Sequence, residues 1–186
     1  MIFTQYIKNH FGSKRGLLRA FVAEIARKLG CYKHLDKVDF RNVKRLVFVC
    51  HGNICRSPLG EAAAKRQGFT AISYGLDTRG GAHADPRAIA FGDAHQILFR
   101  EHKTRQIKQY QPCAGDLLIG MEPRHARHLK KLYGADVQIT LAGLWLKAPA
   151  AYLHDPYNAN AIFFNRCESL VVQAADNLVQ KVKEQQ

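Results

Sequence analysis

The stretch VCHGNICRSP, residues 49–58, joins two runs of sequence with different patterns. The apolar run LVFV at residues 46–49 is typical of a buried strand, and the small-residue run at residues 59–67 is typical of a helix. The alternation continues, with further strands predicted at residues 71–74, 116–121 and 137–141 and helices at 86–99, 123–133 and 162–182. Strands that alternate with helices predict an α/β fold, in which helices cover both faces of a parallel sheet.

The composition is that of one globular domain. The chain has 186 residues, of which 47% are hydrophobic and 23% are charged, enough for one substantial core. No apolar run reaches the roughly 18–20 residues of a membrane span, and the first residues lack the apolar stretch of a secretory signal. We therefore expect a cytoplasmic protein. The five cysteines are an odd number without the spacing of a metal site, which argues against a disulfide framework and against zinc.

The positive charge is concentrated at the N-terminal end. The formal net charge is +13, and residues 1–45 hold eleven Lys and Arg against three acidic residues, a local balance of +8. Residues 1–44 are predicted to be a basic, helical extension of a domain at residues 45–186. Ser13 is a candidate N-cap for a helix with apolar residues at helical spacing, namely Leu17, Leu18, Phe21, Val22, Ile25 and Leu29. We favour packing of this helix on its own domain, with binding to a partner or to a membrane surface as the alternative.

The loop at residues 49–58 has the composition of a phosphate-binding loop. A loop wrapped around a phosphate can aim successive backbone N–H groups at its oxygens, and the helix N-terminus behind it adds partial positive charge. Gly52 permits the tight path, and Asn53 tolerates unusual backbone angles. The expected phosphate ligands are the loop residues His51, Gly52, Asn53, Ile54, Cys55 and Arg56.

Cys50 is the candidate nucleophile at the start of this loop. Cations and dipoles at such a position favour the thiolate, the form that attacks phosphorus, and Ser57 can donate a hydrogen bond to it. Arg56, six residues later, offers a planar guanidinium that matches two phosphate oxygens and grips them more tightly as the transition state forms. The alternative is an inert, buried thiol, a frequent role of free cysteine that leaves the neighbouring arginine and serine unexplained.

These residues resemble the low-molecular-weight protein tyrosine phosphatases. That family carries a Cys-x5-Arg-Ser loop near its start, here Cys50 to Ser57, and an Asp-Pro-Tyr near its end, here residues 155–157. The resemblance covers about residues 45–184, including the motif HKTRQI at residues 102–107. It implies a three-layer fold with a four-stranded parallel sheet, hydrolysis of phosphotyrosine through a phosphocysteine, and neither a metal nor another cofactor.

The resemblance also implies the roles of supporting residues. Asp155 is expected as general acid and then general base, because the phenolate of tyrosine, with a pKa of about 10, needs a proton as it leaves. Asn53 and His102 are expected to share a hydrogen bond that helps to hold the loop, and Tyr157 is expected to line the substrate cleft. Cys55 can pair with Cys50 under oxidation and protect it from irreversible damage, with a plain buried thiol as the alternative.

The same scaffold supports other activities. Protein arginine phosphatases carry Thr where Ile54 stands, so Ile54 favours tyrosine. Arsenate reductases need a close pair of further cysteines, whereas Cys113 and Cys167 are far apart in the sequence. A phosphate-binding module without catalytic activity would not need the nucleophile Cys50, the phosphate clamp Arg56 and the general acid Asp155 together. Binding of nucleic acid is not expected, because basic and aromatic residues are not interleaved.

The loop at residues 77–85 indicates which partners to expect. It lacks the aromatic residue of eukaryotic members and looks like that of bacterial members linked to exopolysaccharide-regulating tyrosine kinases. We expect a phosphotyrosine protein as substrate, with a bacterial tyrosine kinase as the candidate and a role in exopolysaccharide production. Asn158 replaces a tyrosine that often follows Tyr157, and Glu122 stands where Asp is common, so substrate preference stays open.

Overall fold

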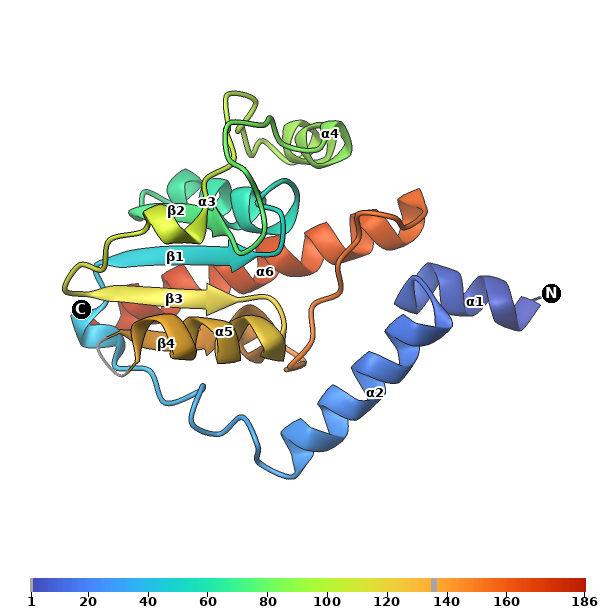
Figure 1. The fold of residues 1–186 in the computed structure, drawn as a ribbon, viewed down its shortest axis with the longest axis horizontal. Coiled ribbons are helices and arrows are strands. Elements are labelled where there is room, and N and C mark those ends of the chain that lie inside the picture. The colour runs from blue at the N-terminus through green and yellow to red at the C-terminus, as the bar shows by residue number, and fades with distance from the viewer. Residues whose placement is uncertain (1, 135–136) are drawn as a thin grey trace.

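A four-stranded parallel sheet forms the centre of the protein, as the computed structural model shows for residues 2–134 and 137–186 (Figure 1). The strands, in the spatial order β2-β1-β3-β4, are β1 Arg45–Cys50, β2 Ala71–Gly75, β3 Asp116–Gly120 and β4 Gln138–Leu141. The helices are α1 Ile2–Phe11, α2 Lys14–Lys28, α3 Arg56–Arg66, α4 Pro86–Ala94, α5 Pro123–Tyr133 and α6 Ala161–Gln185. Among the described residues, no helix has both the length and the hydropathy to cross a bilayer.

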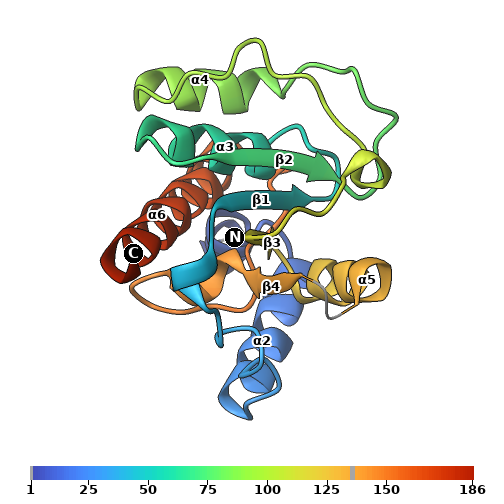
Figure 2. The same cartoon turned by 90° about the vertical axis from the view of Figure 1, so that its left-hand side faces the viewer.

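Both faces of the sheet are covered (Figures 1 and 2). Side chains alternate between the faces along each strand, so Leu46 and Phe48 of β1 pack in one core with α3 and α6. Val47 and Val49 point the other way and pack with Leu129 of α5. The central strands are apolar on both sides because neither side meets water. The predicted three-layer α/β fold is confirmed.

The structure moves some of the predicted helix boundaries. Helix α3 begins at Arg56, before the predicted residue 59, so that its N-terminus directly follows the loop. Helix α4 ends at Ala94, before the predicted residue 99, because Gln96 adopts a positive φ of 57° and Ile97 N–H donates back to the Gly92 carbonyl at 2.8 Å. The extension was predicted to be helical, but a separate helix with the bounds of α1 was not predicted.

Helix α2 begins as predicted but packs by the opposite face. Ser13 caps it, accepting a hydrogen bond from Gly16 N–H at 3.0 Å. The favoured packing of the helix on its own domain is found, but not through its apolar face: Leu18, Phe21, Val22, Ile25 and Leu29 are exposed. The helix instead presents its small residues to the protein: Gly16 and Ala23 are buried, and Ala23 packs with Ala126 and Leu141. Small side chains allow the helix backbone to approach closely, which leaves the larger apolar ones on the outside.

Candidate active site

A loop at residues 51–55 connects the end of β1 to the start of α3. Its backbone carbonyls accept hydrogen bonds from outside: His51 O accepts from Asp77 N (2.9 Å), and Ile54 O accepts from Asp85 N (2.8 Å). Because the C=O and N–H of one peptide unit point in opposite directions, the amides that follow these carbonyls are directed into the loop. Together with the N-terminus of α3, they form a cradle suited to an anion.

Asn53 fixes the shape of this loop. It is fully buried with a φ of 58°, in the left-handed region that Asn tolerates better than most residues. Its Nδ2 donates to Ser57 Oγ and Ser73 Oγ, both at 2.9 Å, and its Oδ1 accepts from Arg105 N at 2.8 Å. His102 Nε2 donates to the Asn53 carbonyl at 3.0 Å, the contact expected for this pair, and burial lowers the pKa of His102.

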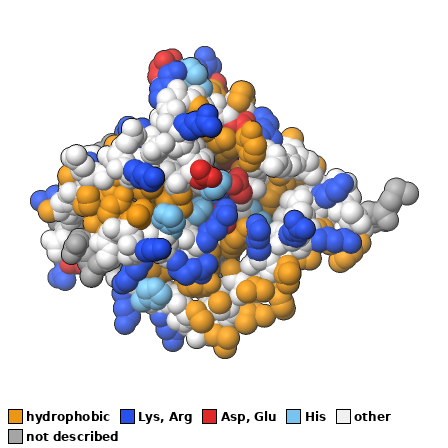
Figure 3. All heavy atoms as spheres, viewed as in Figure 1, with side chains coloured by type: hydrophobic (Ala, Val, Ile, Leu, Met, Phe, Trp, Pro, Cys, Tyr) orange, Lys and Arg blue, Asp and Glu red, His pale blue; other side chains and the backbone are white. Residues whose placement is uncertain are grey.

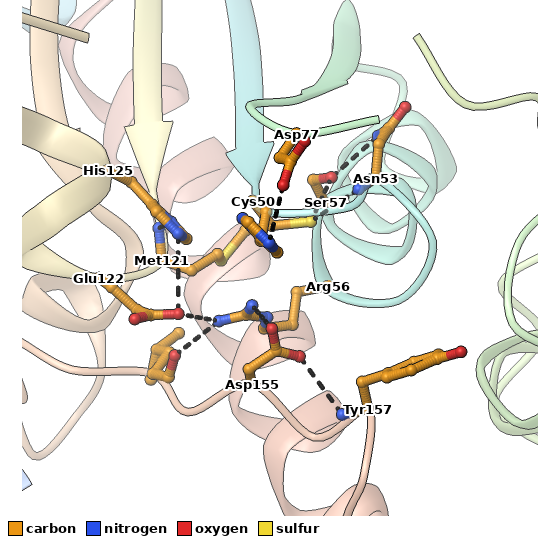
Figure 4. Close-up of polar contacts among 12 residues, drawn as sticks. Cys50, Asn53, Arg56, Ser57, Asp77, Met121, Glu122, His125, Asp155 and Tyr157 are labelled. Carbon is orange, nitrogen blue, oxygen red and sulfur yellow. Dashed lines mark hydrogen bonds and ion pairs between the residues drawn. The ribbon is translucent and has the colours of Figure 1, made fainter. Parts of the chain in front are cut away.

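Cys50 lies buried at the floor of the loop, as Figure 4 shows. Its Sγ lies 3.0 Å from Ser57 Oγ and accepts from Asn53 N–H at 3.3 Å. The Ser57 hydroxyl also lies 3.3 Å from the Tyr74 carbonyl, to which it can donate while Cys50 keeps its proton. Once the thiol is deprotonated, the same hydroxyl is placed to donate to the sulfur and stabilise the thiolate.

Arg56 is the largest fully buried side chain of the site. One terminal nitrogen donates to Glu122 Oε1 (2.9 Å) and to the Leu153 carbonyl (3.0 Å), and the other lies 2.9 Å from Asp155 Oδ2. Burial opposes its charge, but the carboxylates of Asp155 and Glu122 outweigh that effect and raise the pKa of Arg56. Its Nε is buried and has no hydrogen-bond partner among the described residues. The Nε edge of the guanidinium therefore remains available for a ligand.

Asp155 and Tyr157 stand at the rim of the site (Figure 4). The Asp155 side chain is 35% exposed; one of its oxygens pairs with Arg56, and the other accepts from Tyr157 N–H at 3.3 Å. The Tyr157 residue is 51% exposed. A carboxylate that is partly exposed to solvent and adjacent to the clamp arginine is in reach of a bound phosphate ester. Among the described residues, no group of three His, Cys, Asp or Glu is placed to hold a metal ion.

Comparison with known proteins agrees with this geometry. The model of the family "Low molecular weight phosphotyrosine protein phosphatase" matches residues 45–186. The chain belongs to this family. Its members are named as protein-tyrosine phosphatases, so the chain is an enzyme of that class, as predicted. The low molecular weight protein-tyrosine-phosphatase Wzb of Salmonella typhi is 30% identical over 145 residues, which cover 76% of this chain and 96% of that protein.

Two solved structures show the same fold as this phosphatase. Wzb of Vibrio vulnificus, in complex with benzylphosphonate, matches with a TM-score of 0.65 at 27% identity and covers 75% of this chain and 99% of its own. The YwlE arginine phosphatase of Geobacillus stearothermophilus matches with a TM-score of 0.70 at 20% identity and covers 77% and 95%. At that identity the second likeness concerns the fold alone.

Three residues of the phosphatase site were not predicted. Glu122 is buried and accepts a hydrogen bond from Arg56. Burial alone would raise the pKa of Glu122, but the positive charge of Arg56 lowers it to about 2. His125, 3.7 Å from Glu122, is uncharged at neutral pH because burial lowers its pKa to about 3. Gly75 ends β2 behind the loop, where a Cβ would lie 3.0 Å from the Asn53 Cβ. Two features of the sequence could have indicated these residues: a glutamate, Glu122, where Asp is common in the family, and a glycine, Gly75, at the end of a predicted strand.

Two buried groups lie beneath the loop. Cys55 packs against Ala88 and Phe164, and burial raises the pKa of its thiol. Glu168 of α6 is completely buried, and neither of its carboxylate oxygens has a hydrogen-bond partner among the described residues. Burial raises the pKa of Glu168 to about 8 in spite of the nearby Arg56 charge. Glu168 is therefore protonated at neutral pH.

The junction of α1 and α2, residues 9–16 and here called the elbow, packs against the segment that carries Asp155. The Phe11 ring lies 6.3 Å from the His154 ring, and Asn160 Nδ2 donates to Asn9 Oδ1 at 3.0 Å. Gly12 has a φ of 71°, and a Cβ there would lie 2.8 Å from the Phe163 ring. The elbow thus contacts residues on both sides of Asp155 in the sequence.

Proposed function

We propose that this phosphatase hydrolyses phosphotyrosine in proteins in two steps, with Cys50 as nucleophile, Arg56 as phosphate clamp and Asp155 as general acid and base. The observation that carries the proposal is the position of Arg56. Its guanidinium is anchored by Glu122 and the Leu153 carbonyl on one side and meets Asp155 on the other, at the end of the loop that begins with Cys50. This position supports a common site for nucleophile, clamp and acid.

In the first step the Cys50 thiolate bonds to phosphorus while the bond from phosphorus to the phenolic oxygen breaks. The loop amides of residues 51–56 and the Arg56 guanidinium hold the three other phosphate oxygens, which gain negative charge in the transition state. The unpartnered Nε of Arg56 and the nitrogen that now contacts Asp155 form the fork for two of them. Protonated Asp155 gives its proton to the phenolic oxygen, so that neutral tyrosine leaves.

In the second step water hydrolyses the phosphocysteine. Asp155, now a carboxylate, takes a proton from the water as its oxygen attacks phosphorus. The sulfur leaves as a thiolate, which the Ser57 hydroxyl at 3.0 Å stabilises. Phosphate is released, and Asp155 keeps the proton taken from water for the next cycle. The exposed Tyr157 ring offers the tyrosine substrate an aromatic surface beside the site.

As physiological substrate we propose a bacterial tyrosine kinase or another phosphotyrosine protein of the cytoplasm, with a role in exopolysaccharide production. The 30% identity to a bacterial Wzb phosphatase supports this class of substrate, as does the loop at residues 77–85. Cys55 is proposed as the redox partner of Cys50.

The test compares wild-type protein with Cys50→Ser and Asp155→Asn on a phosphotyrosine peptide, a phosphoarginine peptide and p-nitrophenyl phosphate, with a metal chelator present. Cys50→Ser should abolish turnover of all substrates. Asp155→Asn should slow phosphotyrosine hydrolysis by about 10²–10⁴ and p-nitrophenyl phosphate less, since nitrophenolate is a weaker base than phenolate. Cys113→Ser, at an exposed free thiol, is the matched control and should keep full activity.

Other results would change the assignment. A preference for phosphoarginine would favour the arginine phosphatase alternative. Absence of activity in reduced wild-type protein, together with binding of the phosphopeptide, would leave a phosphate-binding module.

A further inference from the structure

The solvent-facing side of α2 carries a continuous apolar stripe. Its members are Leu18, Phe21, Val22, Ile25 and Leu29, which are between 43% and 77% exposed. At about 100° per residue these positions fall on one side of the helix, opposite the buried Gly16 and Ala23. Figure 3 shows this stripe as a patch of hydrophobic side chains along the lower edge of the molecule. A contiguous apolar surface of this kind marks a binding face on a water-soluble fold.

Basic residues border the stripe. Lys14 and Arg15 lie on the first turn of α2, are exposed, and form no ion pair within residues 2–134 and 137–186. On the same side as Arg15, a groove of about 420 Å³ between α2 and α5 is lined by Arg19 and Arg127 next to Leu18. Helix α1 carries a further exposed aromatic residue, Phe3, which is 71% accessible. An apolar centre with a cationic border is the pattern that inserts between anionic headgroups while its charges contact their phosphates.

We propose that α1 and α2 bind the surface of an anionic lipid bilayer, with the stripe of α2 inserted at the level of the headgroups. An anionic bilayer is favoured as the binding partner because its negative charge complements the positive charge of the extension. The extension has a balance of +8 in residues 1–45, and the whole chain has a net charge of +13, so two stripes from two copies of this chain would bring like charges together. An anionic membrane instead supplies negative charge along the whole length of the helix.

The experiment is co-sedimentation of the full-length protein with vesicles of phosphatidylcholine alone or with about 30% phosphatidylserine, at low and at high salt. We expect binding to the anionic vesicles and weakening by salt. The double substitution Phe21→Ser/Ile25→Ser should lower the partition coefficient at least about tenfold, because two large apolar side chains no longer enter the interface. Leu98→Ser, at an equally exposed leucine on the loop after α4, is the matched control and should bind normally.

The contribution of charge is tested separately. Lys14→Gln/Arg15→Gln should weaken binding to anionic vesicles, whereas Lys108→Gln/Lys147→Gln, equal in charge but away from the stripe, should have a smaller effect. The melting temperature and p-nitrophenyl phosphate hydrolysis of each variant show that the fold and the site are intact, so a failure of this proposal is distinct from a failure of the proposed catalytic function.

Three results would overturn the proposal. The first is no binding to anionic vesicles at low salt. The second is binding that Phe21→Ser/Ile25→Ser leaves unchanged. The third is a dimer, seen by light scattering in the absence of vesicles, that the same substitution dissociates; this would assign the stripe to a second copy of the chain.

Discussion

Glu168→Gln should stabilise the protein, and increasingly so as the pH rises. Glu168 is completely buried on α6, and burial raises its pKa from 4.5 to about 8. The folded protein therefore keeps this proton up to about pH 8, whereas the unfolded chain releases it near its ordinary pKa. The stabilising contribution is present at low pH and is lost as the pH rises through this window, at about 1.4 kcal/mol per pH unit. Glutamine has the same shape without the titration, so the variant avoids this loss.

Between about pH 5.5 and pH 7.5 the free energy of unfolding of Glu168→Gln should gain about 2.5 kcal/mol relative to wild type, or about 5–10 °C in melting temperature. Urea unfolding of both proteins at several pH values measures the difference directly, and other titrating groups cancel between them. Glu184→Gln, on the same helix but exposed, is the control and should show no such rise. Parallel pH dependence of wild type and Glu168→Gln would refute the reasoning, because it would mean that Glu168 is ionised in the folded protein.

Three further predictions concern the loop and its supports. Asn53→Ala removes two buried side-chain hydrogen bonds and one partly buried one, and places Ala at a φ of 58°, so urea unfolding should show a loss of about 3–4 kcal/mol, and kcat for p-nitrophenyl phosphate should fall. Glu122→Gln removes the buried countercharge of Arg56, which is expected to cost about 3 kcal/mol of stability in the same measurement. Gly12→Ala puts a Cβ 2.8 Å from the Phe163 ring at a positive φ, and should slow phosphotyrosine peptide hydrolysis more than p-nitrophenyl phosphate hydrolysis if the elbow positions the acid. Equal slowing of both substrates would contradict that last reasoning.

Most of the fold could be predicted because its determinants are local. The β1 strand, the loop and the start of α3 follow one another within residues 45–66, where the apolar run, the glycine and the helix-forming residues all agree. The orientation of α2 could not be predicted, because both of its faces are compatible with packing. The choice depends on how closely the helix backbone approaches its neighbours, and this favoured the face with Gly16 and Ala23.

The residues of the site also fall into those that could be predicted from the sequence and those that could not. Cys50, Arg56 and Ser57 lie in one motif, so their chemistry could be inferred from spacing. Glu122 contacts Arg56, and the charge of Arg56 acts on buried Glu168, both across more than fifty positions of sequence. A single glutamate in a helical or loop sequence is usually a solvated surface residue. Only the fold shows that these two carboxyl groups are buried beside the loop.

Because the elbow contacts the segment around Asp155, the extension and the catalytic domain are expected to evolve together. Only glycine fits at residue 12, because a side chain there would collide with Phe163. The neighbouring Phe11 lies beside His154. A smaller side chain at residue 163 would remove this collision, but the φ of 71° would still favour glycine at residue 12, and a larger side chain would be tolerated only with a compensating change in the elbow. Among relatives that carry the same extension, residue 163 should therefore vary together with the elbow, and the extension should be inherited together with the sequence around Asp155.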